Sequence, residues 1–377
     1  MLGDTHPDTL ASINNLAILL KDQGKLSEAE PLYRDALCGR REVLGDTHLD
    51  TLGSINNLAI LLSDQGKLSE AEQLYRDALR GRRETLGDTH PDTFASINNL
   101  ASLLSKQGKL SVAEQLYRDA LRGRREVLGD THPDTFASCF NLACLLSDHG
   151  KLSEAELLYR DALCGCCKVL GDAHHQTLSL INNLAILLGK KGELSEAELL
   201  YRDALRGRRE ALGDTHPDTL TSINNLANLL KDQGKLSEAE QLYRDALRGR
   251  REVLGDTHPD TLASIFSLAK LLSDQGKLSE AEQLYRDALR GRRETLGDAH
   301  PQTLASIFSL AKLLSDQGKL SEAEPLYRDF WCGRRETLGD THPDTIASIN
   351  ILALLLRIQG KLSEAELLYR DALRGCH

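Results

Sequence analysis

The apolar residues of this chain recur at helical spacing, and glycine ends each helical run. Residues 213–254 show the pattern once. Apolar side chains return every three or four positions, at Leu220, Ile223, Leu226, Ala227 and Leu230. This spacing predicts the buried face of an α-helix. Pro217 and Asp218 suit its first turn, where a missing N–H does no harm and negative charge is favoured, and Gly234 suits its end.

A second helical run follows within the same segment. Its apolar stripe consists of Leu242, Tyr243, Ala246 and Leu247. Ser237 and Glu240 have the Ser-x-x-Glu spacing of a capping box, which predicts that this helix opens at Ser237. Gly255 predicts its end. The segment therefore forms two antiparallel helices joined by a short turn, called helix A and helix B below.

The helix pair repeats along the chain with a period of 42 residues. One glycine per repeat marks the period: Gly3, Gly45, Gly87, Gly129, Gly171, Gly213, Gly255, Gly297 and Gly339. A period of this size indicates a solenoid of stacked units. We expect one all-α array over residues 1–377, with repeats at about 1–44, 45–86, 87–128, 129–170, 171–212, 213–254, 255–296, 297–338 and 339–377.

Composition and charge argue against two kinds of partner. The net charge of −10 is mildly acidic, whereas a nucleic-acid-binding protein needs a basic face. No apolar run approaches the roughly 20 residues of a membrane helix. The first residues lack the basic and apolar regions of a secretory signal. We therefore expect neither a nucleic-acid partner nor a membrane partner.

The cysteines predict a reducing compartment, most simply a cytoplasmic location. Their spacing is irregular, and five of them replace arginines of other repeats: Cys38, Cys164, Cys166, Cys167 and Cys376. A disulfide framework would recur with the repeat. The Cys-Gly-Cys-Cys stretch at 164–167 lies on one helix, where its thiols point in different directions, whereas zinc needs four tetrahedral ligands. We predict no metal and no cofactor.

The recurring polar motifs predict structural roles. Every repeat carries a His-x-Asp or His-x-Gln element, such as the one beginning at His6, which we interpret as turn and capping chemistry. The stretch RDALRGRRE of helix B is balanced by nearby acids, and we interpret it as a solvated outer face; the alternative is an anion-binding surface. There is no Gly-rich phosphate loop, nucleophile elbow or unique His-Asp-Ser set, so no enzymatic activity is expected.

The spacing of small and large residues resembles that of the tetratricopeptide repeat. The positions that carry the resemblance are Ile223, Leu226, Ala227, Leu230, Gly234, Ala239, Tyr243 and Ala246. The 42-residue repeat length and the sequence motifs NNLA and GKxxEAE are similar to those of kinesin light chain repeats. The resemblance implies a right-handed α-solenoid of nine tandem helix-turn-helix repeats that binds proteins or peptides.

Asparagines on helix A are the main candidates for a binding site. Asn-Asn pairs recur in five repeats, and a sixth repeat keeps the second position: Asn14, Asn15, Asn56, Asn57, Asn98, Asn99, Asn141, Asn182, Asn183, Asn224 and Asn225. Helical spacing places them away from the core stripe, on the side that would be concave in a stacked array. An amide has two donors and two acceptors, so it can pair with a peptide backbone. In the resembled family, concave asparagines hold peptides in this way.

The repeat geometry fits such a role. Helices pack about 8–10 Å apart, and an extended peptide rises about 3.3 Å per residue, so one asparagine per helix A would meet roughly every third peptide residue. Two other interpretations remain open. Each asparagine bonds a neighbouring helix of the same array, or duplication of the unit copied the pair without selection.

Two repeats replace the asparagine pair with an aromatic residue and serine. Phe266 is followed four residues later by Lys270, and Phe308 by Lys312, so that each ring lies beside an ammonium on one helix face. This pattern predicts a preference for an acidic peptide with an aromatic or large apolar anchor. The alternative is that both repeats are copies of one drifted unit.

These observations favour a protein-interaction scaffold that binds extended peptides on its concave face. The alternative is an architectural spacer without a dedicated ligand, in which apolar ends without polar caps promote end-to-end self-association. A further alternative is a fragment of a larger regulatory or adaptor protein.

Overall fold

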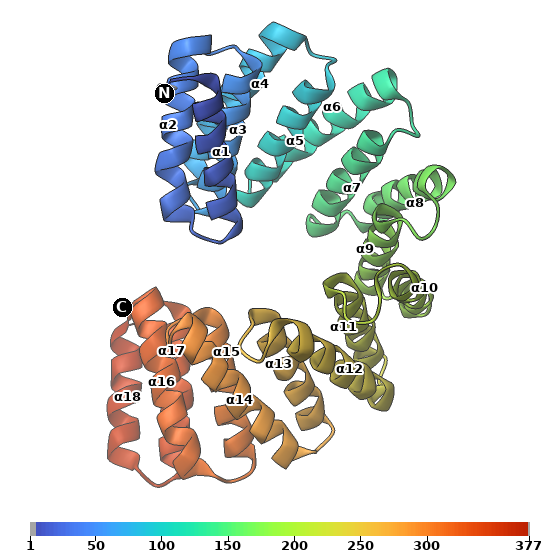
Figure 1. The fold of residues 1–377 in the computed structure, drawn as a ribbon. Coiled ribbons are helices and arrows are strands. Elements are labelled where there is room, and N and C mark those ends of the chain that lie inside the picture. Colours follow the sequence, from blue (N-terminus) through green and yellow to red (C-terminus); the bar gives the residue numbers. More distant parts are fainter. Residues whose placement is uncertain (1–4, 376–377) are drawn as a thin grey trace. The chain divides into compact units, whose positions relative to one another are not determined.

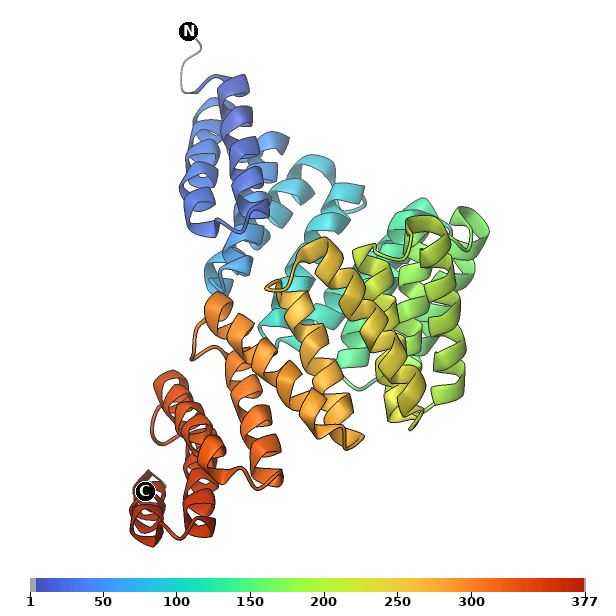
Figure 2. The same cartoon turned by 60° about the horizontal axis from the view of Figure 1, so that its bottom comes forward.

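The computed structural model describes residues 5–375, and over this range the chain consists of helices and short connections. Gly3 and Cys376 lie outside the described residues. Figure 1 shows the helices as successive antiparallel pairs, and Figure 2 shows the same pairs from another side. By its contacts the chain divides after Lys191 into two compact units, unit 1 and unit 2. The predicted all-α array of helix pairs is confirmed.

Odd-numbered helices are the A helices and even-numbered ones the B helices, and within each unit successive helices pack on one another. Unit 1 contains α1 (Pro7–Asp22), α2 (Leu26–Leu44), α3 (Leu49–Asp64), α4 (Leu68–Leu86), α5 (Pro91–Lys106), α6 (Leu110–Leu128), α7 (Pro133–Asp148), α8 (Leu152–Leu170) and α9 (His175–Lys191). Unit 2 contains α10 (Leu194–Leu212), α11 (Pro217–Asp232), α12 (Leu236–Leu254), α13 (Pro259–Asp274), α14 (Leu278–Leu296), α15 (Pro301–Asp316), α16 (Leu320–Leu338), α17 (Pro343–Ile358) and α18 (Leu362–Gly375).

A histidine caps the start of each described A helix. In α11, Nδ1 of His216 accepts a hydrogen bond of 3.2 Å from the backbone N–H of Asp218. The equivalent bond is present in the other eight repeats. It satisfies one of the backbone donors that a helix start leaves unpaired. The interpretation of His-x-Asp as a capping element is therefore confirmed.

The predicted capping box at the start of helix B is wrong. Helix α12 begins at Leu236, one residue before Ser237, and its N-cap Lys235 makes no side-chain cap bond. Glu240 instead accepts hydrogen bonds from Arg244 and from Lys277 of the next repeat. The Ser-x-x-Glu spacing arises because this glutamate serves contacts between repeats.

The predicted apolar stripes form the core. All five stripe residues of α11 are buried, and so are Tyr243, Ala246 and Leu247 of α12. Glycine on helix B allows helix A of the same repeat to approach closely. A Cβ on Gly249 would lie 2.6 Å from Leu220 Cδ2, closer than packed atoms tolerate, so a side chain here would force the helices apart.

One arginine of the Arg-Gly-Arg-Arg stretch is buried, and for this residue the interpretation as a solvated face is wrong. Arg250 is 9% exposed and lies at the end of α12. Its Nη1 donates to the backbone oxygen of Asp260 at 3.1 Å and to Ser264 Oγ at 2.5 Å, both on α13. The guanidinium therefore joins helix B of one repeat to helix A of the next.

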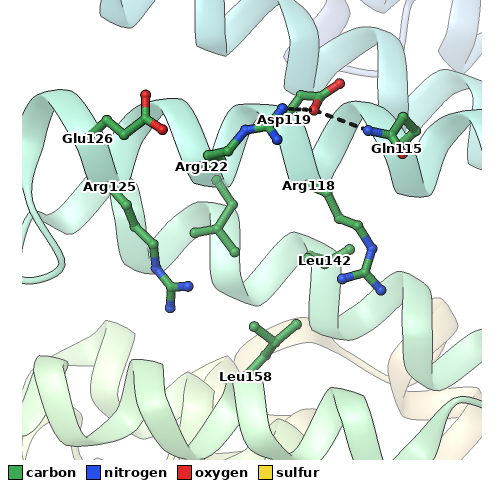
Figure 3. Close-up of a pocket in the computed structure, with 9 residues that line it drawn as sticks. Gln115, Arg118, Asp119, Arg122, Arg125, Glu126, Leu142 and Leu158 are labelled. Carbon is green, nitrogen blue, oxygen red and sulfur yellow. Dashed lines mark hydrogen bonds and ion pairs between the residues drawn. The ribbon is translucent and has the colours of Figure 1, made fainter.

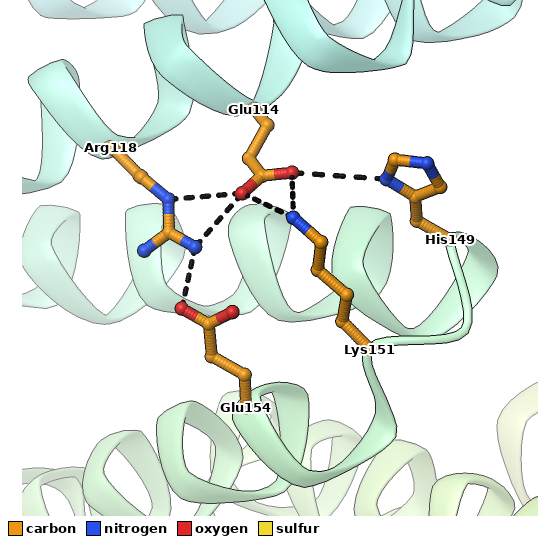
Figure 4. Close-up of polar contacts among 5 residues, drawn as sticks. All are labelled: Glu114, Arg118, His149, Lys151 and Glu154. Atoms are coloured by element: carbon orange, nitrogen blue, oxygen red, sulfur yellow. Dashed lines mark hydrogen bonds and ion pairs between the residues drawn. The ribbon is translucent and has the colours of Figure 1, made fainter.

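A second polar link between repeats joins their B helices, as Figure 4 shows for Glu114. Its side chain is 13% exposed and accepts from Lys151 Nζ at 2.8 Å and from Arg118 Nη2 at 2.9 Å. Arg118 also donates to Glu154 of the next repeat, and His149 lies 3.8 Å away from Glu114. Hydrogen bonds from Lys151, and then from Arg118, lower the pKa of Glu114 against the opposing effect of burial.

Candidate binding surface

The structure separates the two members of each asparagine pair. The first members lie deep: Asn14, Asn98 and Asn182 are buried, and Asn56 and Asn224 are half-buried. The second members are more open: Asn15 is exposed, and Asn57, Asn99, Asn141, Asn183 and Asn225 are half-buried. We call these six second members the amide row. The expectation that both members avoid the core therefore holds for the amide row but fails for the buried first members.

Hydrogen bonds between repeats hold part of the amide row. Asn57 Nδ2 donates to Asn14 Oδ1 at 3.3 Å, and Asn99 Nδ2 donates to Asn56 Oδ1 at 2.8 Å. This is the contact that one alternative interpretation expected, a bond to a neighbouring helix of the same array. Each such bond uses one donor of the row amide and leaves its second N–H and its oxygen for other partners.

The fourth repeat interrupts this pairing. Phe140 replaces the first asparagine there, and Asn183 Nδ2 donates instead to the backbone oxygen of Ser179 on its own helix. Asn141 makes no side-chain hydrogen bond to any residue of the described range, and Asn98 Oδ1 is buried without a partner there. The amide of Asn141 is thus open to an external partner.

In unit 2, the predicted aromatic residues pack onto tyrosines of their own repeats. The Phe266 ring meets Tyr285 edge-on at 5.4 Å, and the Phe308 ring meets Tyr327 at 6.2 Å. Both phenylalanines are half-buried, whereas Lys270 and Lys312 are exposed one turn further along the same helices. Each of these repeats therefore presents a fixed ring near a free ammonium group.

A cation already covers one of these rings. The Arg292 guanidinium lies 4.8 Å from the centre of the Phe266 ring, a cation–π distance. Phe308 instead lies 5.1 Å from the ring of Phe330. Sequence reasoning missed both contacts because they join helices A and B of one repeat, and neither the arginine nor Phe330 lies near the phenylalanine in the sequence.

Hollows also lie between successive B helices. Figure 3 shows one of about 410 Å³, which Arg118, Arg122 and Arg125 border and which has Leu142 and Leu158 on its floor. Each arginine has an acidic partner: Arg118 pairs with two glutamates, Arg122 with an aspartate one turn away, and Arg125 with the aspartate at 130. The three arginines that border this hollow are therefore already paired with acidic side chains.

The described cysteines are free thiols in different environments: Cys38, Cys139, Cys144, Cys164, Cys166, Cys167 and Cys332. Cys166 is buried, Cys167 half-buried and Cys164 exposed, so the Cys-Gly-Cys-Cys stretch does not converge on one point. Within residues 5–375, no three His, Cys, Asp or Glu side chains lie close enough together to hold a metal ion. None of the helices in that range combines the length and apolar character needed to cross a bilayer.

A chain of antiparallel helix pairs, with a row of amides on the A helices of six of them, has the features of a helical-repeat scaffold. It belongs to the tetratricopeptide repeat family. Family models described as "Tetratricopeptide repeat" match residues 50–126, 92–163, 176–252 and 218–294 in one form, and residues 9–50, 303–344 and 345–377 in another. This fold typically serves as a non-enzymatic scaffold for protein interactions.

Solved structures with similar folds include kinesin light chain-like proteins. A putative kinesin light chain of Podosopora anserina with nearly identical repeats is 27% identical; the match covers 55% of this chain and 98% of that one, with a TM-score of 0.50. BtubC (BKLC) of P. vanneervenii is 25% identical over 66% of this chain and 94% of that one, with a TM-score of 0.51. The resemblance predicted from the sequence is confirmed.

A more distant structure shares the fold over nearly the whole chain. The apo form of the quorum sensor NprR from B. thuringiensis is 16% identical, and the match covers 98% of this chain and 97% of that one, with a TM-score of 0.57. Among curated proteins, none matches the sequence.

Proposed function

We propose that this protein is a non-catalytic scaffold that binds extended peptide segments along its A helices. The observation that carries the proposal is the amide row, with one amide per A helix in six repeats. In unit 1, Asn57 and Asn99 keep a spare N–H after bonding the preceding repeat, and Asn141 keeps its whole amide. A peptide backbone supplies the N–H and C=O groups that such amides pair with.

Two repeats of unit 2 carry phenylalanine in place of the first asparagine, and their lysines indicate the charge of the proposed ligand. Lys270 and Lys312 are exposed beside Phe266 and Phe308. We propose that they favour an acidic peptide with an aromatic or large apolar anchor, because buried apolar area supplies affinity and complementary charge supplies selectivity. Irregularly placed free thiols support a reducing, most simply cytoplasmic, location.

The experiment is peptide capture by the purified full chain, with Asn141→Ala as the diagnostic variant. This change breaks no internal hydrogen bond, so a loss of peptide affinity reports on ligand contact. Ser105→Ala is the matched control, because Ser105 is a half-buried polar residue of α5 that likewise makes no side-chain hydrogen bond within the described range. The proposal predicts weaker capture by Asn141→Ala at unchanged thermal stability. Equal capture by the wild type and Asn141→Ala would contradict it.

A second candidate function is a self-assembling spacer. Exposed leucines on α1 and α18 favour it: Leu16 is 47% exposed and Leu19 54%, while Leu362 and Leu373 are each more than 60% exposed. These side chains occupy positions that a further stacked repeat would cover. Light scattering over a hundredfold concentration range tests this candidate, because a Leu16→Lys/Leu19→Lys variant should abolish any growth in mass.

A further inference from the structure

One repeat junction lacks the arginine that joins helix B to the next helix A at the other junctions. In unit 1, Arg40, Arg82 and Arg124 donate to a serine hydroxyl 14 residues later, at 2.6 to 2.7 Å. At the junction of α8 and α9, the arginine is replaced by Cys166 and the serine by Leu180. Both partners of the polar link have changed together, and both replacements are buried.

A cavity of about 280 Å³ lies at this junction. The rings of Phe136 and Phe140, with Cys166 and Leu180, supply its apolar wall, while His175 and Gln176 border it. No Asp, Glu, Lys or Arg lines it. Burial raises the pKa of the Cys166 thiol to about 11, so this group is neutral as well.

Another repeat of the same chain shows what normally occupies this space. Phe266 and Arg292 hold the same repeat positions as Phe140 and Cys166. There the guanidinium lies 4.8 Å from the ring centre and covers it. Phe140 keeps the equivalent edge-on contact with a tyrosine, at 6.0 Å from Tyr159, but a short thiol stands where the covering cation would be. The face of Phe140 therefore borders the cavity.

We propose that this cavity is a binding site for a neutral aromatic ring, from either a small molecule or a peptide side chain. An engineered apolar cavity of about 150 Å³ holds benzene, so the larger volume here accommodates a bicyclic ring such as indole. Two phenylalanines offer stacking and edge contacts to such a ring. A charged guest would find no counter-ion, and burying it would be costly.

The cavity adjoins the amide row. Phe140 immediately precedes Asn141 on α7, and Ser179 lines the cavity while its backbone oxygen accepts the hydrogen bond from Asn183. A peptide held by these two asparagines would pass the mouth of the cavity. The peptide source of the ring therefore rests on the proposed function, whereas the small-molecule source does not.

The test uses 5-fluoroindole as the probe and fluorine NMR of the full chain as the readout. Cys166→Arg/Leu180→Ser restores the link found at the other junctions of unit 1 and should place a guanidinium over the Phe140 ring, as Arg292 lies over Phe266. Cys164→Arg adds the same charge at an exposed position of the same helix and is the matched control. The proposal predicts that the wild type and Cys164→Arg broaden the probe signal equally, and that the double variant binds at least roughly tenfold more weakly. Phe140→Asn, which restores the residue of other repeats, should also weaken binding.

No binding by the wild type, or undiminished binding by the folded double variant, would overturn the proposal. A second measurement then distinguishes the two sources of the ring. It compares a captured peptide that contains Phe or Trp with the same peptide in which that residue is Ala. If the peptide supplies the ring, 5-fluoroindole competes with the aromatic peptide and the double variant loses only that peptide. If a small molecule supplies it, the probe binds without competing. Failure of the proposed function would differ from both, because peptide capture would be absent while the probe still binds.

Discussion

Asn99 donates a hydrogen bond of 2.8 Å from Nδ2 to Oδ1 of Asn56 in the preceding repeat. This bond explains why a residue that is poor for helices recurs in the middle of helix A. Asn14 and Asn56 lie deep enough to accept a bond across a repeat junction. Asn57 and Asn99 donate across it and remain half-buried.

The first prediction separates the internal role of the amide row from its proposed external role. Asn99→Ala should be less stable than Asn141→Ala by about 1 kcal/mol, because only Asn99 loses a hydrogen bond within the array. Asn141→Ala should be neutral or slightly stabilising, since alanine favours the helix. Urea denaturation followed by circular dichroism measures both. Equal stabilities would mean that the bond between repeats contributes nothing.

The second prediction concerns the buried arginine. Arg250→Cys should destabilise unit 2 by about 1.5–3 kcal/mol, because two hydrogen bonds from a charged group are lost. Adding Ser264→Leu should recover part of that loss, since the junction at Cys166 and Leu180 already uses this combination. Thermal melts of the single and double variants measure the coupling between positions 250 and 264. If the double variant is destabilised by more than the two single variants together, the two positions do not compensate each other.

The third prediction is a stability change in acid. Hydrogen bonds from Lys67, and then from Arg34, lower the pKa of Glu30 to about 2. A carboxylate with a lowered pKa in the folded state stabilises the fold above its ordinary pKa, and this stabilisation is lost as pH falls through the folded value. Unfolding free energy should therefore fall between about pH 4.5 and pH 2. In Glu30→Gln the slope should be shallower, whereas in Glu84→Gln, an exposed control, it should match the wild type.

The fourth prediction concerns metal. Because Cys164, Cys166 and Cys167 differ in burial and do not converge, a chelator should leave the thermal melt of the purified protein unchanged. Elemental analysis provides an independent check. Stoichiometric zinc whose removal lowers the melting temperature would show that these thiols serve a site that forms only with the metal.

Helix periodicity and the 42-residue period were sufficient to predict the helix pairs and the core stripe, because both follow from local spacing. The contacts between repeats could not be predicted in this way. Glu240 has the spacing of a capping residue, yet it bonds Lys277 of the next repeat. Arg250 lies in a stretch rich in charge, yet it is buried against Ser264. In both cases the partner lies on another helix, and helical spacing carries no information about it.

A signal for the buried arginine was nevertheless present in the sequence. Arginine and serine recur 14 residues apart at successive junctions, and at one junction Cys166 and Leu180 replace both. Such paired replacement indicates contact. Helical spacing predicted the helix face on which the asparagine pairs lie. It did not predict how deeply each asparagine is buried, because burial of Asn14 or Asn98 depends on how closely the next repeat packs.

The fifth prediction tests the central claim, that the A helices hold an extended peptide and that Lys270 and Lys312 select its charge. The measurement is a peptide array probed with the wild type, with Lys270→Ala/Lys312→Ala, and with Arg248→Ala/Arg290→Ala as a control that removes the same charge from exposed positions on B helices. Wild type and control should enrich acidic peptides with an aromatic or large apolar residue. The lysine double variant should lose roughly two- to thirtyfold in affinity for them, because exposed ion pairs contribute about 0.2–1 kcal/mol each. An array on which the wild type shows no acidic preference, or on which the lysine variant keeps it, would contradict the account.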